Sequence, residues 1–90
     1  MVANRFAIIG RFYSYLEDKN ILIISLPEDE DALIPIVLWG NKLNENIKSL
    51  SYGDLVGITA NFVKSKGKFC KIQADKVTFM QGANAGKEAN

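Results

Sequence analysis

The hydrophobic and polar positions of this chain first alternate over residues 5–16. Apolar side chains dominate the even positions from Phe6 to Leu16, while the odd positions include arginines and tyrosines. A period of two predicts a β-strand, and we expect its even face to lie in a core, with Tyr13 and Tyr15 exposed. Gly10 lies inside this strand, where a glycine typically marks a bulge or a sharp bend.

Two shorter apolar segments follow and are also predicted to be strands. They cover residues 21–26 and 33–39. Pro35 has no N–H to donate, so its part of the second segment is expected at an edge or near the beginning of the strand. The acidic run at residues 28–31 is expected to form a solvated loop, because four adjacent carboxylates repel one another.

The period then changes to that of a helix. Leu43, Ile47 and Leu50 are spaced by four and three residues, which is one stripe of an α-helix. Asn41 is a suitable cap for its start, and Gly53 is a plausible terminator after its end. We therefore predict one helix between the third and fourth strands.

Alternation returns in residues 55–64, where Phe62 shares the phase of the predicted core, and again in residues 69–80. A tight connection with Gly67 is expected between these two strands. In the last strand Cys70 falls in the core phase and is expected to be a buried hydrophobe. The phase changes afterwards, which predicts a bulge near residues 75–76.

The order of elements is three strands, one helix and two strands. This order predicts an all-β domain, a five-stranded Greek-key barrel of the OB-fold type with the helix between strands 3 and 4. An SH3-like barrel is the second candidate. We expect residues 1–81 to form this domain and residues 82–90, which are small and polar, to form a disordered tail.

Composition excludes several kinds of chemistry. The 90 residues include one cysteine and no histidine, so histidine catalysis, a disulfide within one chain and zinc sites built from Cys and His are excluded. The chain has no P-loop or dinucleotide-binding motif, and we expect neither an enzyme, a cofactor nor a metal. Arg5 and Arg11 interrupt the N-terminal apolar residues, and no apolar run could span a bilayer, so we expect a cytoplasmic protein.

The charges are segregated along the chain although they nearly cancel. Residues 62–80 carry five lysines against Asp75, whereas residues 17–31 carry six acids against Lys19, and the total is +1. OB-fold barrels bind oligonucleotides or oligosaccharides, and single-strand binding combines cations for phosphates with aromatic rings for bases. The lysines are also suited to a simpler role, since lysines keep edge strands soluble and unpaired.

Several residues fit such a binding surface. Aromatic and basic side chains are interleaved in the last hairpin, and Arg11 and Tyr13 share the exposed phase of the first strand. Trp39 suits either base stacking or the core, and Tyr13 suits either a base or a subunit interface. The candidates drawn from these patterns are Arg11, Tyr13, Trp39, Lys64, Lys66, Lys68 and Phe69.

Four segments together resemble bacterial single-stranded DNA-binding proteins. They are Asn4–Arg11, Ile36–Gly40, Tyr52–Ile58 and Ala74–Met80, in the family's order and spacing. The resemblance implies that Trp39 is a stacking aromatic, that Arg5 contacts phosphate, and that Lys66 lies in a hairpin which grips the strand, with Phe69 near a second stacking position. It also implies a homo-oligomer, a dimer or tetramer, with Ala7, Ile9 and Tyr13 suited to the contacts.

The chain departs from the family pattern in three places. Leu33 and Tyr52 replace a family aromatic and a family lysine, and the acidic-hydrophobic tip of the family's long tail is not found after Lys87. We therefore do not expect recruitment of other enzymes through such a tip.

Three hypotheses about function follow. The leading one is non-catalytic binding of single-stranded DNA in replication, recombination or repair, with RNA as a further possible ligand. The second is a primosome-type accessory OB protein, and the third is a protein-interaction barrel without a nucleic-acid role.

Overall fold

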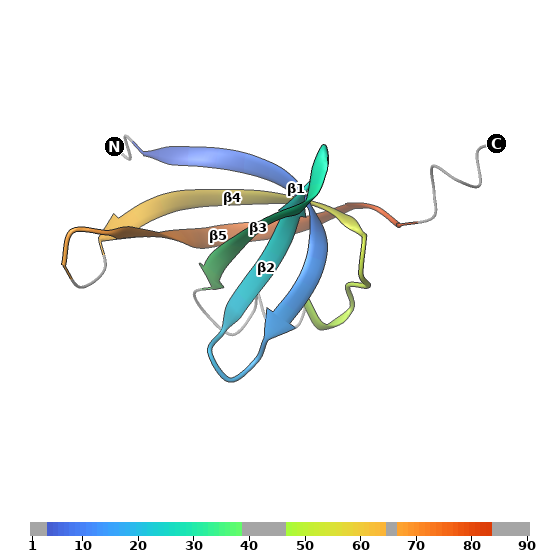
Figure 1. Ribbon diagram of the computed structural model, residues 1–90, viewed down its shortest axis with the longest axis horizontal. Helices are drawn as coiled ribbons and strands as arrows, with labels where there is room; N and C mark the ends of the chain where they lie inside the picture. Colours follow the sequence, from blue (N-terminus) through green and yellow to red (C-terminus); the bar gives the residue numbers. More distant parts are fainter. Residues whose placement is uncertain (1–3, 39–46, 65–66, 84–90) are drawn as a thin grey trace.

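The computed structural model describes residues 4–38, 47–64 and 67–83 and shows one closed β-barrel (Figure 1). Its strands are β1 (Arg5–Leu16), β2 (Ile21–Leu26), β3 (Asp29–Leu38), β4 (Leu55–Lys64) and β5 (Cys70–Gln81). They are ordered β1-β2-β3-β5-β4, and β4 pairs with β1 to close the barrel. Neighbouring strands are antiparallel, except that β3 and β5 are parallel. The predicted five-stranded OB-fold barrel is confirmed.

The predicted helix lies mostly outside the described residues. Ile47 and Lys48 are helical, and residues 39–46 are not described. The start of the helix therefore stays a prediction. Its end is described: Lys48 is the last helical residue, so Leu50 lies beyond the helix and Gly53 does not directly follow its end. Ile47 is buried among the side chains of the barrel core, as the helical stripe requires.

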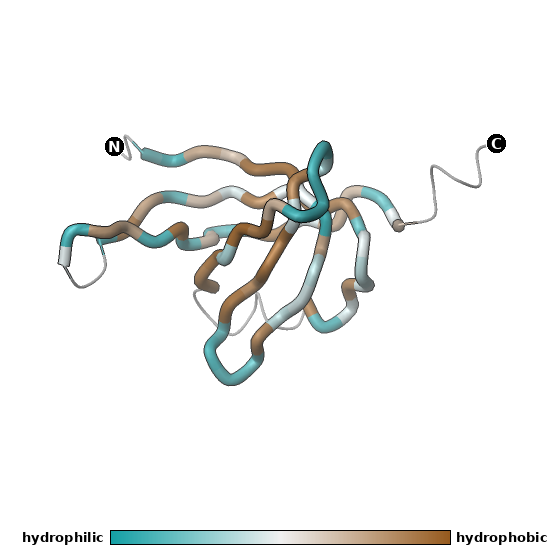
Figure 2. Tube along the Cα trace, in the orientation of Figure 1, coloured by the Kyte–Doolittle hydropathy of each residue, from teal (hydrophilic) through white to brown (hydrophobic). Residues whose placement is uncertain are grey.

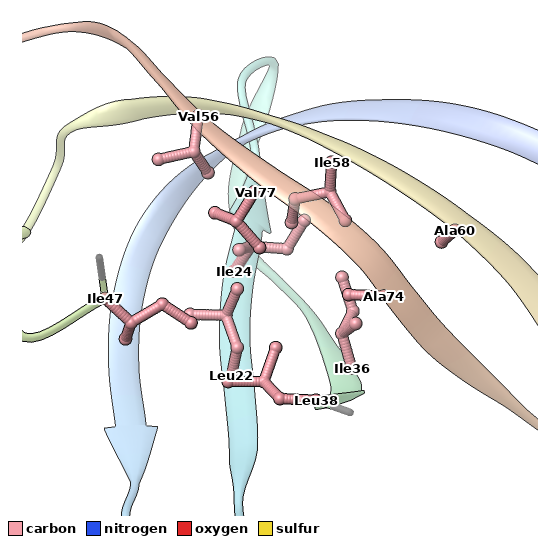
Figure 3. Packing of buried hydrophobic residues seen from close by; sticks show 10 residues of the cluster. All are labelled: Leu22, Ile24, Ile36, Leu38, Ile47, Val56, Ile58, Ala60, Ala74 and Val77. Carbon is pink, nitrogen blue, oxygen red and sulfur yellow. The ribbon is translucent and has the colours of Figure 1, made fainter. Parts of the chain in front are cut away.

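The core fills the interior of the barrel with aliphatic side chains from alternate strand positions (Figure 3). Removing these side chains from water drives folding. The buried cluster consists of Leu22, Ile24, Ile36, Leu38, Ile47, Val56, Ile58, Ala60, Ala74 and Val77.

The strand β1 changes its inward face part of the way along. Its register with β2 shifts between Phe12 and Ser14, so Tyr13 is the extra residue of a bulge. After the bulge Tyr15 packs against the core, while Leu16 is 37% exposed. The prediction of an even inward face is therefore wrong for Leu16, and the prediction that Tyr15 is exposed is wrong as well.

The acidic run belongs largely to a strand, so the prediction of a loop is wrong for Asp29–Asp31. The strand β3 begins at Asp29, which pairs with Leu26, and Pro27 and Glu28 form the turn. All four acids are exposed at the hydrophilic tip of this hairpin (Figure 2), where their carboxylates stay in water. An exposed extension of a hairpin can therefore carry charges that a core strand could not.

The strands β4 and β5 extend beyond the rest of the barrel as a projecting hairpin (Figure 1). We call its described residues, Phe62–Lys64 and Gly67–Ile72, the arm. Cys70 belongs to the arm and is exposed, which corrects the prediction that it is buried. The alternation along β5 puts Cys70 in phase with the core residues. However, β1 pairs with β4 only as far as Asn61, so no described strand covers the part of the hairpin that contains Cys70.

Two finer predictions for this hairpin are confirmed. Gly67 has a φ of 83° in the connection between the strands. The register shifts between Thr59 and Ala60, which leaves Asp75 as the extra residue of a bulge in β5.

Candidate nucleic-acid interface

The arm has two faces, which the strand register defines. Phe62 pairs with Ile72 and Lys64 pairs with Cys70, while Val63 lies between them on its strand. Directly opposite residues of an antiparallel pair point to the same side, and successive residues point to opposite sides. Phe62, Lys64, Cys70 and Ile72 therefore share one face of the arm, and Val63 lies on the other.

The arm is positively charged and contains no acid among its described residues. Lys64, Lys68 and Lys71 are all exposed, and Phe69, which lies between Lys68 and Lys71 in the sequence, is 84% exposed. The structure therefore places Lys64, Lys68 and Phe69 on the same hairpin. Exposed ammonium groups and a bare aromatic ring are the two components that an unpaired polynucleotide requires.

A groove of about 310 Å³ lies between β3 and the base of the arm. Among the described residues, β3 pairs with β5 only at Val37 and Leu38, so the strands separate on the arm side of these pairs. Pro35 lies in the separated part and has no N–H for a ladder with β5. The described lining residues are Ile21, Ile34, Pro35, Val37, Cys70, Lys71 and Ile72. The groove therefore offers apolar walls next to the lysines.

Phe62 is an aromatic residue that the sequence analysis assigned to the core. It is 48% exposed and its ring contacts that of Phe6, with ring centroids 4.7 Å apart. Its alternation with Val56, Ile58 and Ala60 continues beyond the point where other strands cover β4. The signal that could have revealed it is the length of the alternating segment, which exceeds what the barrel covers.

Arg5 lies at the base of the arm but is already paired. It is opposite Asn61 on β4, and its Nη2 is 2.9 Å from Oδ2 of Asp75. Both side chains are substantially exposed, so water screens the pair and its stabilising effect is small. A phosphate that approached Arg5 would compete with this carboxylate.

Arg11 and Tyr13 lie at the opposite end of β4, so the structure does not bring them to the arm. Arg11 is opposite Leu55, and its guanidinium donates a 2.9 Å hydrogen bond to the carbonyl oxygen of Gly53. Tyr13 contacts the ring of Tyr52 edge-on at 5.8 Å. The ten residues of β4 separate the two ends by about 30 Å.

The two remaining predicted site residues, Trp39 and Lys66, lie outside the described residues. In the sequence, Trp39 directly follows Leu38, the last residue of β3, and Lys66 belongs to the connection of the arm. Their roles therefore stay predictions.

The described residues show neither a metal site nor a membrane helix. They contain no cluster of three or more His, Cys, Asp or Glu side chains that could hold a metal ion. Within the same residues, no helix has the length and apolar character needed to cross a membrane.

Comparison with known proteins identifies similar structures but no related sequence. No protein-family model matches the chain, and no curated protein matches it. The mitochondrial single-stranded DNA-binding protein Rim1 of S. cerevisiae is similar in structure, with a TM-score of 0.69 at 17% identity over 91% of this chain and 99% of Rim1. OBody NL8, solved bound to hen egg-white lysozyme, has a TM-score of 0.68 at 20% identity over 92% of this chain and 100% of its own. At these identities the similarity shows the fold, and this chain is an OB-fold protein.

Proposed function

We propose that this protein binds single-stranded DNA, without catalysis, along the arm and the adjoining groove. The observation that carries the proposal is the juxtaposition of exposed lysines with apolar and aromatic surface on one side of the barrel. A single strand presents phosphates and unstacked bases together, whereas a duplex keeps the faces of its bases inside. Replication, recombination and repair are the processes in which such strands are exposed.

The arm supplies both parts of the binding energy. Lys64 and Lys68, with Lys66 between them in the sequence, neutralise phosphates. Phe62 and Phe69 offer exposed rings to bases, at about 1–3 kcal/mol for each stacked base. Trp39, which follows Leu38 in the sequence and lies outside the described residues, is proposed as a further stacking residue on the ground of the family resemblance. Arg5 adds a cation at the base of the arm when a phosphate displaces Asp75.

Two similarities support this proposal. The four sequence segments that resemble bacterial single-stranded DNA-binding proteins extend over most of the barrel. Rim1, whose structure is similar, is itself a mitochondrial single-stranded DNA-binding protein. The first similarity concerns the residues, and the second concerns the path of the backbone.

Titration of tryptophan fluorescence with oligo-dT at several salt concentrations tests the proposal. We expect binding that weakens with salt, and Lys64→Gln and Lys68→Gln should each lower affinity and reduce the log–log salt slope by about 0.7. Lys19→Gln, in the exposed turn after β1, is the matched control and should leave both values unchanged. Failure to bind any oligonucleotide at every salt concentration would contradict the proposal. Oligo-U in the same titration compares the affinity for RNA with that for DNA.

We also propose that a second copy of the chain covers the outer face of β1, β4 and β5. A shallow groove of about 290 Å³ on this face is lined by Ala7, Ile8, Ile9, Gly57, Ile58, Thr59, Thr78 and Met80. None of these residues is charged, and Ile9 and Met80 are about half exposed. In the described structure, residues 5–10 of β1 pair with β4 along one edge, and the other edge carries no strand.

A role in protein recognition without DNA is the alternative that one observation favours. The structurally similar OBody NL8 is bound to a protein, hen egg-white lysozyme. A protein ligand on an apolar face would bind with little dependence on salt, so the salt titration separates this alternative from the proposal. A primosome-type role would instead appear as competition between oligo-dT and a helicase for the arm.

A further inference from the structure

We propose that the groove between β3 and the arm is a subsite for a single base and that it selects thymine over uracil. This inference rests on the proposed function, since it concerns how the same surface recognises the bases of the bound DNA strand. Thymine differs from uracil by one methyl group at C5 of the ring. An apolar groove distinguishes the two bases because it can cover that methyl group.

The walls of the groove are aliphatic on both sides. Val37 and Pro35 form the β3 side, Ile72 and Cys70 form the arm side, and Ile21 and Ile34 complete the apolar lining. Lys71 is the one charged residue among the described lining residues. A base edge placed here leaves water and contacts carbon and sulfur atoms. The groove therefore binds a base with an apolar substituent more tightly.

The charge around the groove indicates that its occupant is part of a polyanion. Lys64 is paired with Cys70, so it shares a face of the arm with two of the lining residues, Cys70 and Ile72. Lys68 is exposed nearby in the sequence, and no acid lies among the described residues of the arm or of the groove lining. A strand whose phosphates contact Lys64 can place a base between Val37 and Ile72.

The size of the preference follows from the burial of one methyl group. Complete transfer of such a group from water to an apolar site corresponds to about a fourfold gain in affinity. A strand with one base in the groove should therefore bind up to about fourfold more tightly as oligo-dT than as oligo-dU. Both oligonucleotides carry deoxyribose, so the comparison does not depend on the sugar.

The variant Val37→Thr tests whether the groove is responsible. Threonine has nearly the shape of valine and suits a strand, but its hydroxyl makes the wall polar. Val37 is half-buried and lies outside the buried core cluster, so we expect the fold to persist. The ratio of the oligo-dU to the oligo-dT dissociation constant should fall toward one, and the salt slope should stay that of the wild type.

Val63→Thr is the matched control, because Val63 belongs to the arm and does not line the groove. It should keep the wild-type ratio. Lys64→Gln should weaken both oligonucleotides by the same factor. Circular dichroism verifies that each variant is folded. If Val37→Thr does not fold, Pro35→Ser, at an exposed position of the groove lining, replaces it.

The outcomes separate the inference from the proposed function. Equal affinity of the wild type for oligo-dT and oligo-dU overturns the thymine subsite and leaves single-strand binding intact. A preference that Val37→Thr does not alter, or that Val63→Thr alters equally, assigns it to stacking elsewhere and also overturns the subsite. If neither oligonucleotide binds, as expected for a protein ligand in the groove, both the proposed function and this inference fail.

Discussion

Gly10 lies where β2 passes close to β1. A Cβ atom at this position would be 2.7 Å from Cδ1 of Ile24 and 2.9 Å from the carbonyl oxygen of Ser25. Ile24 is fully buried and the oxygen belongs to the backbone, so neither atom can move away at low cost. The requirement for glycine is therefore one of space between two strands.

We predict that Gly10→Ala destabilises the barrel by about 1–3 kcal/mol, the usual cost of overpacking a core. This cost corresponds to a fall in melting temperature of about 4 °C or more for a domain of this size. Thermal unfolding followed by circular dichroism measures it. Gly82→Ala, where no atom lies within 4 Å of the added Cβ, is the control, and equal melting temperatures for the two variants would refute the explanation.

Individual residues show where alternation predicts the structure and where it does not. Gly10 is predicted to mark a bulge or a sharp bend, but the bulge occurs at Tyr13, three residues later. A bulge reverses the faces of all later residues, so one unplaced bulge gives the wrong side for both Tyr15 and Leu16. The alternation records a preference for two faces and does not record where an extra residue is inserted.

Among the elements, the turn before β4 and the end of β5 are joined by one buried carboxylate. Asp54 is 7% exposed, and its two oxygens accept hydrogen bonds from the backbone N–H groups of Ser51 at 2.8 Å and Ala83 at 3.1 Å. Arg11 holds the same turn through the carbonyl oxygen of Gly53. These bonds fix where the chain leaves the barrel after β5.

We predict that Asp54→Asn lowers the free energy of unfolding by about 1–3 kcal/mol. The amide has one acceptor oxygen, so its NH₂ group would face one of the two N–H donors and leave that donor without a partner. Urea denaturation measures the loss. Asp18→Asn in the exposed turn after β1 should change stability little, and an equal effect of both substitutions would argue against the role of the buried carboxylate.

The strands that were predicted least accurately are those that extend beyond the barrel. Asp29–Asp31 and Cys70 depart from prediction in opposite directions, since the acids form a strand and the thiol is exposed. In both cases a hairpin continues past the core, where Asp29 still pairs with Leu26 and Cys70 with Lys64, but neither position is buried. Local composition predicts the length of a hairpin poorly, because hairpin length depends on which neighbours are present.

At the scale of the whole molecule, the predicted site residues separate into two groups. Lys64, Lys68 and Phe69 lie on the arm, with Arg5 at its base, while Arg11 and Tyr13 lie at the other end of β4. The sequence could identify the residue types that suit the binding of single-stranded DNA. It could not assign them to one end of the barrel, because their positions depend on the register between β1 and β4.

We predict that the outer face of the barrel joins two copies of the chain in solution. Ile9→Arg places a charge in the uncharged groove of the outer face, where desolvating it would oppose association, so the mass measured by light scattering should fall to that of the monomer. Leu33→Arg, an equally drastic change at an exposed position on β3, should leave the mass unchanged. A monomeric wild-type protein would contradict the proposed interface.

The parallel junction of β3 and β5 also determines how the barrel can deform. Each strand contributes two residues to this junction in the described structure, whereas β4 and β5 are paired over most of their length. A small separation there costs few backbone hydrogen bonds and leaves the three antiparallel hairpins, β1–β2, β2–β3 and β4–β5, intact. The barrel can therefore open between β3 and β5. The backbone amide protons of these two strands beside their junction should exchange with solvent sooner than those of the antiparallel strand pairs.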